Sequence, residues 1–252
     1  STLPRPASSV RKQFDLTGRV ALVTGAAGFL GGHFAEALAE MGAVPVVLDL
    51  DPLAVSAAVE RLRLQGYDAR GWPLDITSVE QVKQTIGEIA QACQRIDVLV
   101  NGAAFAMKNL QGGGASFFAP FEEYEQRLWQ VSLDVNLTGT FLVTQAVGAI
   151  MKAQRRGSIV NIASDVAVIS PDHRIYQPDP STDYPGVPFN TPIAYSVSKA
   201  GILAFTRYLA TYWASDGIRV NSIASIIRHH IIFKTISGDR INTIIPITGN
   251  CI

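Results

Sequence analysis

A tyrosine and a lysine four residues apart are the most reactive pair that the sequence offers. Tyr195 and Lys199 lie in a stretch typical of a helix, where this spacing places both side chains on one face, one turn apart. A phenol normally keeps its proton to about pH 10, but a nearby ammonium favours the phenolate and lowers the pKa. The pair could therefore exchange a proton with a substrate near neutral pH. Because surface helices also carry such pairs by chance, the pair alone does not indicate catalysis, and the evidence must come from the segments that precede it.

A glycine-rich turn near the N-terminus is typical of nucleotide binding. Residues 19–24 are an apolar run rich in β-forming residues; Gly25, Gly28 and Gly31 follow, and apolar residues then recur at helical spacing up to Gly42. Glycines permit the tight turn between strand and helix, and they let a pyrophosphate reach the backbone amides at the helix N-terminus. The turn therefore predicts a dinucleotide site.

An acidic residue at the end of the second apolar run indicates which dinucleotide binds. Asp49 lies 24 residues after Gly25, close to the offset of about 20 residues that is typical of a ribose-binding carboxylate. A carboxylate there accepts hydrogen bonds from ribose hydroxyls and repels the 2′-phosphate of NADP, and the glycine turn holds no Arg or Lys. We therefore expect NAD rather than NADP. The alternative is that Asp49 or Asp51 only caps the next helix.

The remaining segments alternate between helical and strand-like patterns. Expected helices cover 53–65, 75–95, 121–152 and 195–215, and further expected strands cover 69–74, 96–100, 157–164 and 218–223. This order predicts an α/β fold: a single-domain, doubly wound parallel sheet of Rossmann type with helices on both faces, six core strands and a seventh in doubt. Residues 1–17 would form an N-terminal arm, 18–223 the dinucleotide-binding and catalytic domain, and 224–252 an atypical tail.

Polar residues at strand ends and inside helices are further candidates for the site. Asp75 could cap the following helix or contact the adenine, and both can hold at once. Asn101, Gly102 and Ala103 follow a buried strand, where small residues suit a cofactor that crosses the sheet edge. Asn136 lies inside an apolar helix, where an unpaired amide is costly to bury, so its presence needs a reason.

Two long loops accompany these candidates. Residues 105–120 contain three consecutive glycines and form either a lid or a surface excursion. Residues 165–192 contain six prolines, which exclude a regular helix. A long irregular loop inside a compact domain is usually functional or disordered, and this one directly precedes the helix of Tyr195, so we expect a substrate wall. Its His173 and Arg174 are candidates for contacts with an anion or a sugar.

The composition excludes several classes of function. The 252 residues, 48% hydrophobic and 17% charged with a formal net charge of zero, suit one domain with a large core. They show neither the basic excess of a nucleic-acid-binding protein nor an apolar run that could span a membrane. Two cysteines make no disulfide framework and the start carries no secretory segment, so a cytoplasmic location is expected. We expect no metal site, because His229, His230 and Cys251 lack a second ligand pair at a matching spacing.

Taken in order, these residues resemble the short-chain dehydrogenase/reductase family, in its single-domain branch. The resemblance covers residues 17–223 and rests on Thr24, Gly25, Gly28, Gly31, Asp49, Asp75, Asn101-Gly102-Ala103, Asn136, Ser164, Tyr195-x-x-x-Lys199 and Ile218-Arg219-Val220-Asn221. The glycine spacing alone is more like that of the extended branch. The resemblance implies an oxidoreductase that transfers hydride between a nicotinamide cofactor and a secondary alcohol or ketone.

The resemblance also implies roles for individual residues. Tyr195 would be the general acid/base, Lys199 would lower its pKa and hold the nicotinamide ribose, and Ser164 would orient the substrate oxygen. Asn136 would keep a water in a proton relay behind Lys199. The expected cofactor contacts are Gly25, Gly28, Phe29, Leu30, Gly31, Asp49, Leu50, Asp75, Ile76, Asn101, Gly102, Ala103, Tyr195 and Lys199.

The proline-rich loop and the C-terminus depart from the usual family pattern. Residues 171–176 and 206–213 resemble bacterial members linked to surface-carbohydrate and nonulosonic-acid biosynthesis, which implies a sugar or a nucleotide sugar as substrate. After Ile223 the family's Pro-Gly turn and last strand are missing, so the tail is diverged, frameshifted or truncated. The helices expected at 121–152 and 195–215 pair subunits in this family, so the resemblance implies a homodimer or homotetramer.

Two other functions stay open. A catalytically impaired dinucleotide-binding protein would fit the abnormal tail, although it has no chemical need for the Tyr, Lys, Ser and Asn set. A reductase of 3-oxoacyl thioesters or small ketones would more naturally use NADPH, so a preference for NADPH would favour it.

Overall fold

The computed structural model describes residues 10–105, 114–170, 173 and 190–224. Six strands form one parallel sheet in the order β3-β2-β1-β4-β5-β6. Their bounds are β1 Val20–Thr24, β2 Val44–Asp49, β3 Arg70–Pro73, β4 Val98–Asn101, β5 Gly157–Ile162 and β6 Ile218–Ile223. The strand order reverses between β1 and β4, which confirms the doubly wound sheet with six core strands. The place where a seventh strand was in doubt, after residue 223, is outside the described residues.

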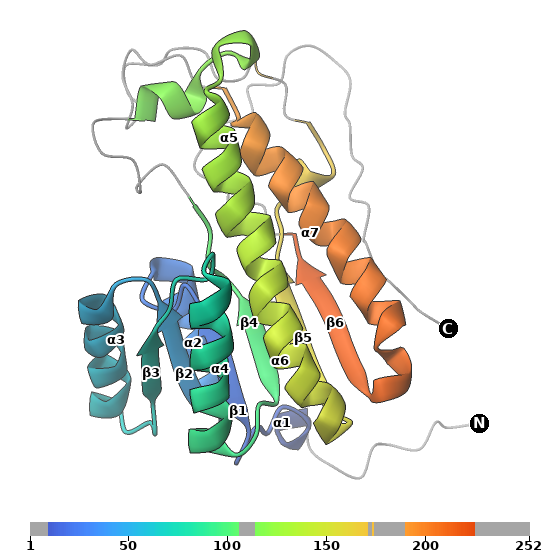
Figure 1. Cartoon of the computed structure of the whole chain (residues 1–252). Coiled ribbons are helices and arrows are strands. Elements are labelled where there is room, and N and C mark those ends of the chain that lie inside the picture. Colours follow the sequence, from blue (N-terminus) through green and yellow to red (C-terminus); the bar gives the residue numbers. More distant parts are fainter. Residues whose placement is uncertain (1–9, 106–113, 171–172, 174–189, 225–252) are drawn as a thin grey trace.

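Helices cover both faces of this sheet (Figure 1). They are α1 Val10–Gln13, α2 Phe29–Glu40, α3 Pro52–Leu64, α4 Val79–Cys93, α5 Gln126–Leu133, α6 Thr140–Gln154 and α7 Ile193–Tyr212. On one face Ile86 of α4, Val147 of α6 and Leu209 of α7 belong to one hydrophobic core. On the other face Ala35 of α2 and Leu62 of α3 belong to a second core.

The strands differ in how far they are buried, and the central position of β1 explains the difference. All five residues of β1 are buried, because helices cover both of its faces. In β5, buried residues alternate with half-buried ones, so one face of this strand is less covered by the described residues. The parallel order brings the carboxyl ends of β1, β4 and β5 to one edge, where the candidate residues lie.

The helix expected at 121–152 begins later and is not uniform. A 3-10 turn occupies Phe121–Glu123, and the extended backbone of Tyr124 and Glu125 delays the α-helix until Gln126. A π-helical turn at Asp134–Gly139 joins α5 to α6, so the two form one continuous rod in Figure 1. This turn contains Asn136, the residue whose place inside a helix needed a reason.

The described end of the N-terminal arm is tied to the domain. The one-turn helix α1 precedes a hydrogen bond from the Leu16 amide to the carbonyl of Met41, 2.8 Å long. Asp15 accepts hydrogen bonds from the amide and hydroxyl of Thr17. Residues 1–9 of the expected arm lie outside the described residues.

Candidate active site

The glycine turn between β1 and α2 fits a pyrophosphate. Gly25 has a φ of 70°, in the left-handed region, and a Cβ added there would lie 2.8 Å from the Cα of Ala103. A Cβ on Gly31 would overlap the carbonyl oxygen of Gly25. Gly28 is the N-cap of α2 and makes no side-chain cap bond, so no cap covers the first amides of this helix. Side chains at Gly25 and Gly31 would thus collide with the backbone of the turn, whose uncapped helix end is the kind of site that holds a pyrophosphate.

The Asp49 carboxylate lies against this turn. Its Oδ2 accepts a hydrogen bond of 3.0 Å from the Ala27 amide, and its Oδ1 accepts one of 2.8 Å from the Leu50 amide. The cap of α3 is Asp51, whose side chain accepts from the Leu53 amide. Asp49 is therefore not a helix cap and is placed at the turn. The predicted contacts with exposed side chains nearby are Phe29, Leu30 and Leu50.

Asp75 and Ile76 follow β3, and the structure changes the interpretation of both. Asp75 accepts from the amide and hydroxyl of Thr77, at 2.9 and 2.7 Å, whereas the cap of α4 is Ser78, which accepts from the Gln81 amide. Of the two possibilities for Asp75, a cap on this helix is therefore wrong, and a contact with the adenine stays a prediction. The side chain of Ile76 packs in the core, so only its backbone could contact a cofactor.

The segment after β4 is locked to the glycine turn through Thr24. The Thr24 hydroxyl accepts hydrogen bonds from the amides of Gly102 and Ala103, at 3.1 and 3.2 Å. A Cβ on Gly102 would lie 2.9 Å from the Thr24 carbonyl oxygen. The two strand ends thus hold each other at the edge where a dinucleotide is expected. Thr24 was noticed in the sequence only as part of the motif.

The side chain of Asn101 points into the sheet, not toward a cofactor. Its amide nitrogen donates to Thr144 of α6 and to the Asn161 side chain of β5, at 2.9 and 2.8 Å, and Asn161 in turn donates to Thr206 of α7. The side-chain oxygen of Asn101 is buried without a hydrogen-bond partner in the described part of the chain. The side-chain nitrogen of Asn101 is therefore taken up within the protein, and a contact of this residue with a cofactor stays a prediction. This network was not predicted from the sequence. The signal for it was Asn161, a polar residue inside the apolar run of β5.

Asn136 joins three segments through the π-helical turn. Its side-chain oxygen accepts from the Phe105 amide at 2.7 Å, and its nitrogen donates to the Ser198 hydroxyl of α7 at 3.2 Å. Its carbonyl oxygen accepts from Thr140 at 2.9 Å. The buried amide is thereby satisfied, which accounts for its place in an apolar helix. The water relay behind Lys199 stays a prediction.

Ser164 and Tyr195 meet at the edge of the sheet. Ser164 follows β5, and Tyr195 lies in the first turn of α7, which packs against the 3-10 turn Asp165–Ala167. Burial raises the pKa of Tyr195 above its usual value near 10; hydrogen bonding with Ser164 lowers it, and the Asp165 charge raises it further. The prediction that the phenol has a lowered pKa is wrong for this structure, because desolvation outweighs the hydrogen bond.

Lys199 explains why the expected lowering is missing. Its ammonium donates a 2.6 Å hydrogen bond to the Ile162 carbonyl and lies 5.6 Å from the centre of the Tyr195 ring. Only 4% of the residue is exposed, and burial lowers the pKa of Lys199 to about 8. Burial thus disfavours the charged form of both residues, the phenolate of Tyr195 and the ammonium of Lys199.

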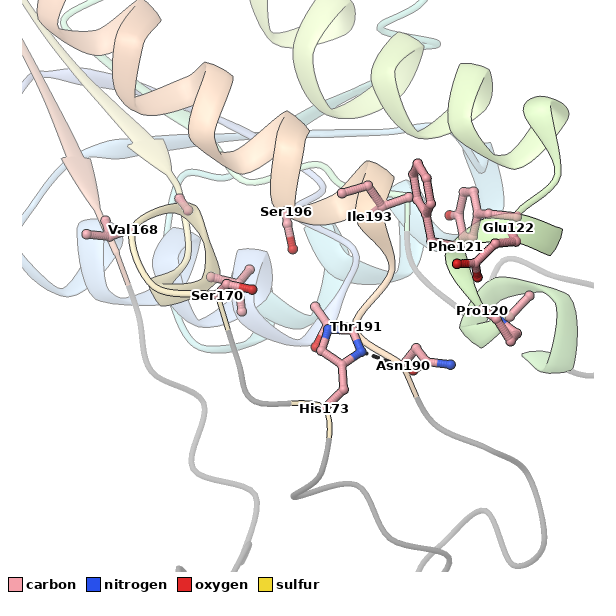
Figure 2. A pocket seen from close by; sticks show the side chains of 14 residues that line it. Pro120, Phe121, Glu122, Val168, Ser170, His173, Asn190, Thr191, Ile193 and Ser196 are labelled. Atoms are coloured by element: carbon pink, nitrogen blue, oxygen red, sulfur yellow. Dashed lines mark hydrogen bonds between the residues drawn. The ribbon is translucent and has the colours of Figure 1, made fainter. Parts of the chain in front are cut away.

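A cavity of about 470 Å³ opens beside these residues (Figure 2). Residues next to Ser164 and Tyr195 line one side, and the segment 119–124 lines the other. The polar residues that line it are Glu122, Tyr124, Ser170, His173, Asn190, Thr191 and Ser196, and no Lys or Arg is found among the described lining residues.

The candidate contact His173 belongs to this cavity. Its Nδ1 lies 3.0 Å from the side-chain oxygen of Asn190, whose nitrogen donates to the Phe118 carbonyl at 3.0 Å. Because the amide of Asn190 is oriented by Phe118, the His173 Nδ1 must be the donor. Arg174, the other candidate from this loop, lies outside the described residues.

Family models match nearly the whole chain. The model described as short chain dehydrogenase matches residues 19–176, and the model described as Enoyl-(Acyl carrier protein) reductase matches residues 184–242. The chain is a short-chain dehydrogenase/reductase. The resemblance to this family is confirmed, and the match extends beyond residue 223, where the resemblance was expected to end. The resemblance to members linked to surface-carbohydrate biosynthesis stays a prediction.

Curated relatives of this short-chain dehydrogenase/reductase include polyol dehydrogenases. The D-threitol dehydrogenase of Mycolicibacterium smegmatis is 33% identical over 242 residues, which cover 94% of this chain and 82% of the relative. The NAD-dependent glycerol dehydrogenase of Listeria innocua is 33% identical over 215 residues, covering 84% of this chain and 72% of the relative.

Solved structures agree with the fold of this short-chain dehydrogenase/reductase. An NAD⁺-bound xylitol dehydrogenase has a TM-score of 0.69 at 33% identity, covering 83% of this chain and 70% of the other. A gluconate 5-dehydrogenase from Burkholderia cenocepacia, in complex with NADP and tartrate, has a TM-score of 0.72 at 29% identity, covering 86% of this chain and 74% of the other. The short-chain dehydrogenase/reductase assignment makes this chain an oxidoreductase that uses a nicotinamide cofactor.

The structure also bears on membranes and metals. Among the described residues, none of the helices is both long and apolar enough to cross a membrane. The same residues contain no group of three or more His, Cys, Asp or Glu side chains that could hold a metal ion. His229, His230 and Cys251 lie outside the described part of the chain.

Proposed function

We propose that this short-chain dehydrogenase/reductase interconverts a secondary alcohol of a neutral polyol or sugar alcohol and the corresponding ketone, with NAD as its preferred cofactor. The names of the threitol, glycerol and xylitol dehydrogenases among its relatives support a polyol. The cavity supports a neutral one, because it holds the Glu122 carboxylate and no cation of Lys or Arg among its described lining residues. A nucleotide sugar, the other substrate class that the sequence implied, would bring phosphate charges into this cavity.

The residues of the glycine turn fit a dinucleotide. Gly25 and Gly31 allow the tight backbone of the turn, Gly28 leaves the first amides of α2 without a side-chain cap, and Asp49 lies beside the turn to accept hydrogen bonds from ribose hydroxyls. A 2′-phosphate would meet the Asp49 carboxylate, which favours NAD over NADP. When bound, the nicotinamide would supply or accept the hydride.

The side chains of the chain itself handle the proton. In oxidation, the Tyr195 phenolate would take the proton of the substrate hydroxyl; in reduction, the phenol would return it. Ser164 would hydrogen-bond the same oxygen, and Lys199 would bind the nicotinamide ribose. Because the pKa of Tyr195 is raised, the phenol is protonated at neutral pH, which suits reduction there and oxidation at alkaline pH.

One observation carries the proposal: Ser164 and Tyr195 interact at the same edge of the sheet as the glycine turn. Replacing Tyr195 by phenylalanine removes only the hydroxyl. We expect Tyr195→Phe to lower the turnover of threitol, xylitol or galactitol about 10²–10⁴-fold while NADH binding is kept. Absorbance of NADH gives the turnover, and its fluorescence gives the binding.

The matched control is Tyr67→Phe, because Tyr67 packs against the second core, on the face of the sheet opposite α7. It should leave both readouts unchanged. Normal turnover of Tyr195→Phe would contradict the proposed role. Binding of NAD without turnover of any polyol would instead favour the impaired dinucleotide-binding protein, and a clear preference for NADPH would favour the 3-oxoacyl-thioester or small-ketone reductase.

We also propose that the enzyme acts in the cytoplasm as a homodimer or homotetramer. Apolar side chains on α6 and α7 are exposed in the single chain, with Phe141 at 43%, Tyr208 at 64% and Tyr212 at 56%. A surface of this kind is typical of an interface between subunits. Light scattering on the purified protein measures the mass directly, and a monomer would contradict the assembly.

A further inference from the structure

The helix turn that carries Tyr195 has no side-chain cap. Tyr195 lies in the first turn of α7, whose N-cap is Pro192, and the amides of Tyr195 and Ser196 bond to the Pro192 carbonyl at 3.1 and 3.2 Å. Proline has no side-chain acceptor for the first amides of a helix, and uncapped helix ends fray. The position of the phenol therefore depends on contacts that hold this turn from the side.

The hydroxyl of Ser198 makes such a contact. Ser198 is 0% exposed, and its hydroxyl donates a 2.8 Å hydrogen bond to the Tyr195 carbonyl. The same oxygen accepts a hydrogen bond of 3.2 Å from the side-chain nitrogen of Asn136, in the π-helical turn against which α7 packs. Figure 1 shows α7 beside the rod that this turn belongs to. Ser198 thus ties the first turn of α7 to the π-helical turn.

The other end of the Asn136 side chain leads to the edge where the cofactor is expected. Its oxygen accepts from the Phe105 amide at 2.7 Å. Phe105 follows Gly102 and Ala103, whose amides donate to the Thr24 hydroxyl beside the glycine turn. No proton in this chain of contacts is donated twice, so all of these hydrogen bonds can exist together. Hydrogen bonds therefore connect the glycine turn to the backbone of the catalytic tyrosine.

We propose that Ser198 is a positioning residue of the reaction: its hydroxyl holds Tyr195 in place relative to the edge where the nicotinamide binds. Ser198 itself is buried away from substrate and cofactor. A misplaced reacting group costs rate more than affinity, because the reacting atoms must lie about 3–3.5 Å apart. The proposal rests on the proposed function, because it assigns Ser198 to the same reaction. It adds a residue outside the Asn136, Ser164, Tyr195 and Lys199 set.

The decisive variant is Ser198→Ala, which removes the hydroxyl and keeps a good helix former in α7. We expect kcat for the oxidation of threitol, xylitol or galactitol to fall about 5–20-fold, while KM and the Kd of NADH change less than about twofold. NADH absorbance gives kcat and KM, and NADH fluorescence gives the Kd. An unchanged kcat, or a loss that is expressed in KM or Kd instead of kcat, would overturn the proposal.

Thr206, about two turns farther along α7, provides the matched control. It is also buried, and its hydroxyl donates to the Ile202 carbonyl at 2.8 Å and accepts from the Asn161 side chain at 2.9 Å. Thr206→Val thus removes the same kind of hydroxyl from the same helix, away from the first turn. The urea midpoint should fall in both variants, because each leaves a buried amide unpaired, but kcat should change less than about twofold in Thr206→Val. An equal loss of kcat in both variants would mean that Ser198 acts only through stability.

Hydrogen exchange without substrate separates this proposal from the proposed function. In Ser198→Ala, the amides of Phe105 and Tyr195 should exchange at least about threefold faster, because both ends of the tie are released; in Thr206→Val they should not change. Unchanged exchange at either amide in Ser198→Ala would overturn the tie, even in an enzyme that oxidises polyols. Faster exchange at both, in a protein that oxidises no polyol, would leave the tie in place and refute the proposed substrate.

Discussion

Lys199, which we propose to be catalytic, lowers the stability of the fold because its charge is buried. Lys199 is only 4% exposed, and among the described residues its ammonium donates a hydrogen bond to the Ile162 carbonyl. Burial disfavours the charged form, so its pKa falls from 10.5 to about 8. The folded protein binds its proton less tightly than the unfolded chain does. The resulting penalty on folding is fully present below pH 8 and disappears as the pH rises from 8 to 10.5.

This penalty can be measured by removing the amine. At pH 7, Lys199→Met should raise the free energy of unfolding by about 1–3 kcal/mol, because no charge is buried. Toward pH 10 the advantage should vanish, since the wild-type amine is then neutral and keeps its hydrogen bond to Ile162. Urea unfolding at both pH values gives the difference.

The control for this experiment is Lys152→Met, because the Lys152 side chain is 53% exposed. Its effect should be small and nearly the same at both pH values. If Lys199→Met raised the free energy of unfolding equally at pH 7 and pH 10, the buried charge of Lys199 could not be the cause. Loss of turnover in the same variant is expected independently.

For single residues, the sequence predicts which side chains lie close together but not how their pKa values change in the folded protein. Tyr195 and Lys199 were identified because their spacing on a helix is local information. The direction of the Tyr195 pKa was not predictable, since it depends on how deeply the ring is buried by segments far away in the chain. The hydrogen bond between Ser164 and Asp165 was not predictable for a related reason: it depends on the turn that orients the two neighbouring side chains.

The turn between β1 and α2 is the element on which cofactor binding depends. A Cβ at Gly31 would overlap the carbonyl oxygen of Gly25, within the backbone itself, so nothing flexible can move aside. Gly31→Ala should therefore destabilise the fold by about 1–3 kcal/mol and weaken NADH binding strongly. Urea unfolding and NADH fluorescence test the two effects.

Gly87 in the middle of α4 is the matched control. No atom lies within 4 Å of a Cβ added there, so Gly87→Ala should stabilise the protein by about 0.5–1 kcal/mol through helix propensity and leave NADH binding unchanged. Similar behaviour of the two alanine variants would contradict the view that the turn at Gly31 is sterically closed.

Elements were predictable where their signals are local. The glycine turn, the apolar strands and the order of helices and strands all follow from short patterns, and the sheet agrees with them. Asn101 was predicted as a cofactor contact from its position at a strand end, but the structure shows that its side-chain nitrogen donates to Thr144 and Asn161. Those partners come from other elements, which a single stretch of sequence does not reveal.

At the scale of the whole molecule, the cavity beside Ser164 and Tyr195 has one carboxylate, and no lysine or arginine, among its described lining residues. Glu122 lines the cavity and Glu123 does not, although both belong to the same exposed 3-10 turn. A cavity with a carboxylate should favour a neutral polyol over a sugar acid such as gluconate. We expect Glu122→Arg to raise the ratio of kcat/KM for gluconate to that for galactitol about tenfold or more.

The same substitution one residue later isolates the effect of the cavity. Glu123→Arg adds equal charge to the same turn and should change the ratio less than about threefold, as expected for a solvent-screened charge. Steady-state rates with both substrates measure the ratios. Equal changes in the two variants would mean that the charge of the whole surface, and not the cavity lining, discriminates between substrates.

The π-helical turn at Asp134–Gly139 links this cavity side of the molecule to its core. Each residue of an α-helix advances the chain by about 100° around the helix axis. The wider π-helical turn therefore determines in which direction the side chains of α6 point. With this phase, Asn136 reaches Phe105 and Ser198 while Val143 and Val147 still point into the core. Substitutions of single side chains in this rod should therefore be tolerated better than deletions. The deletion of one residue would rotate the buried face of α6 toward solvent.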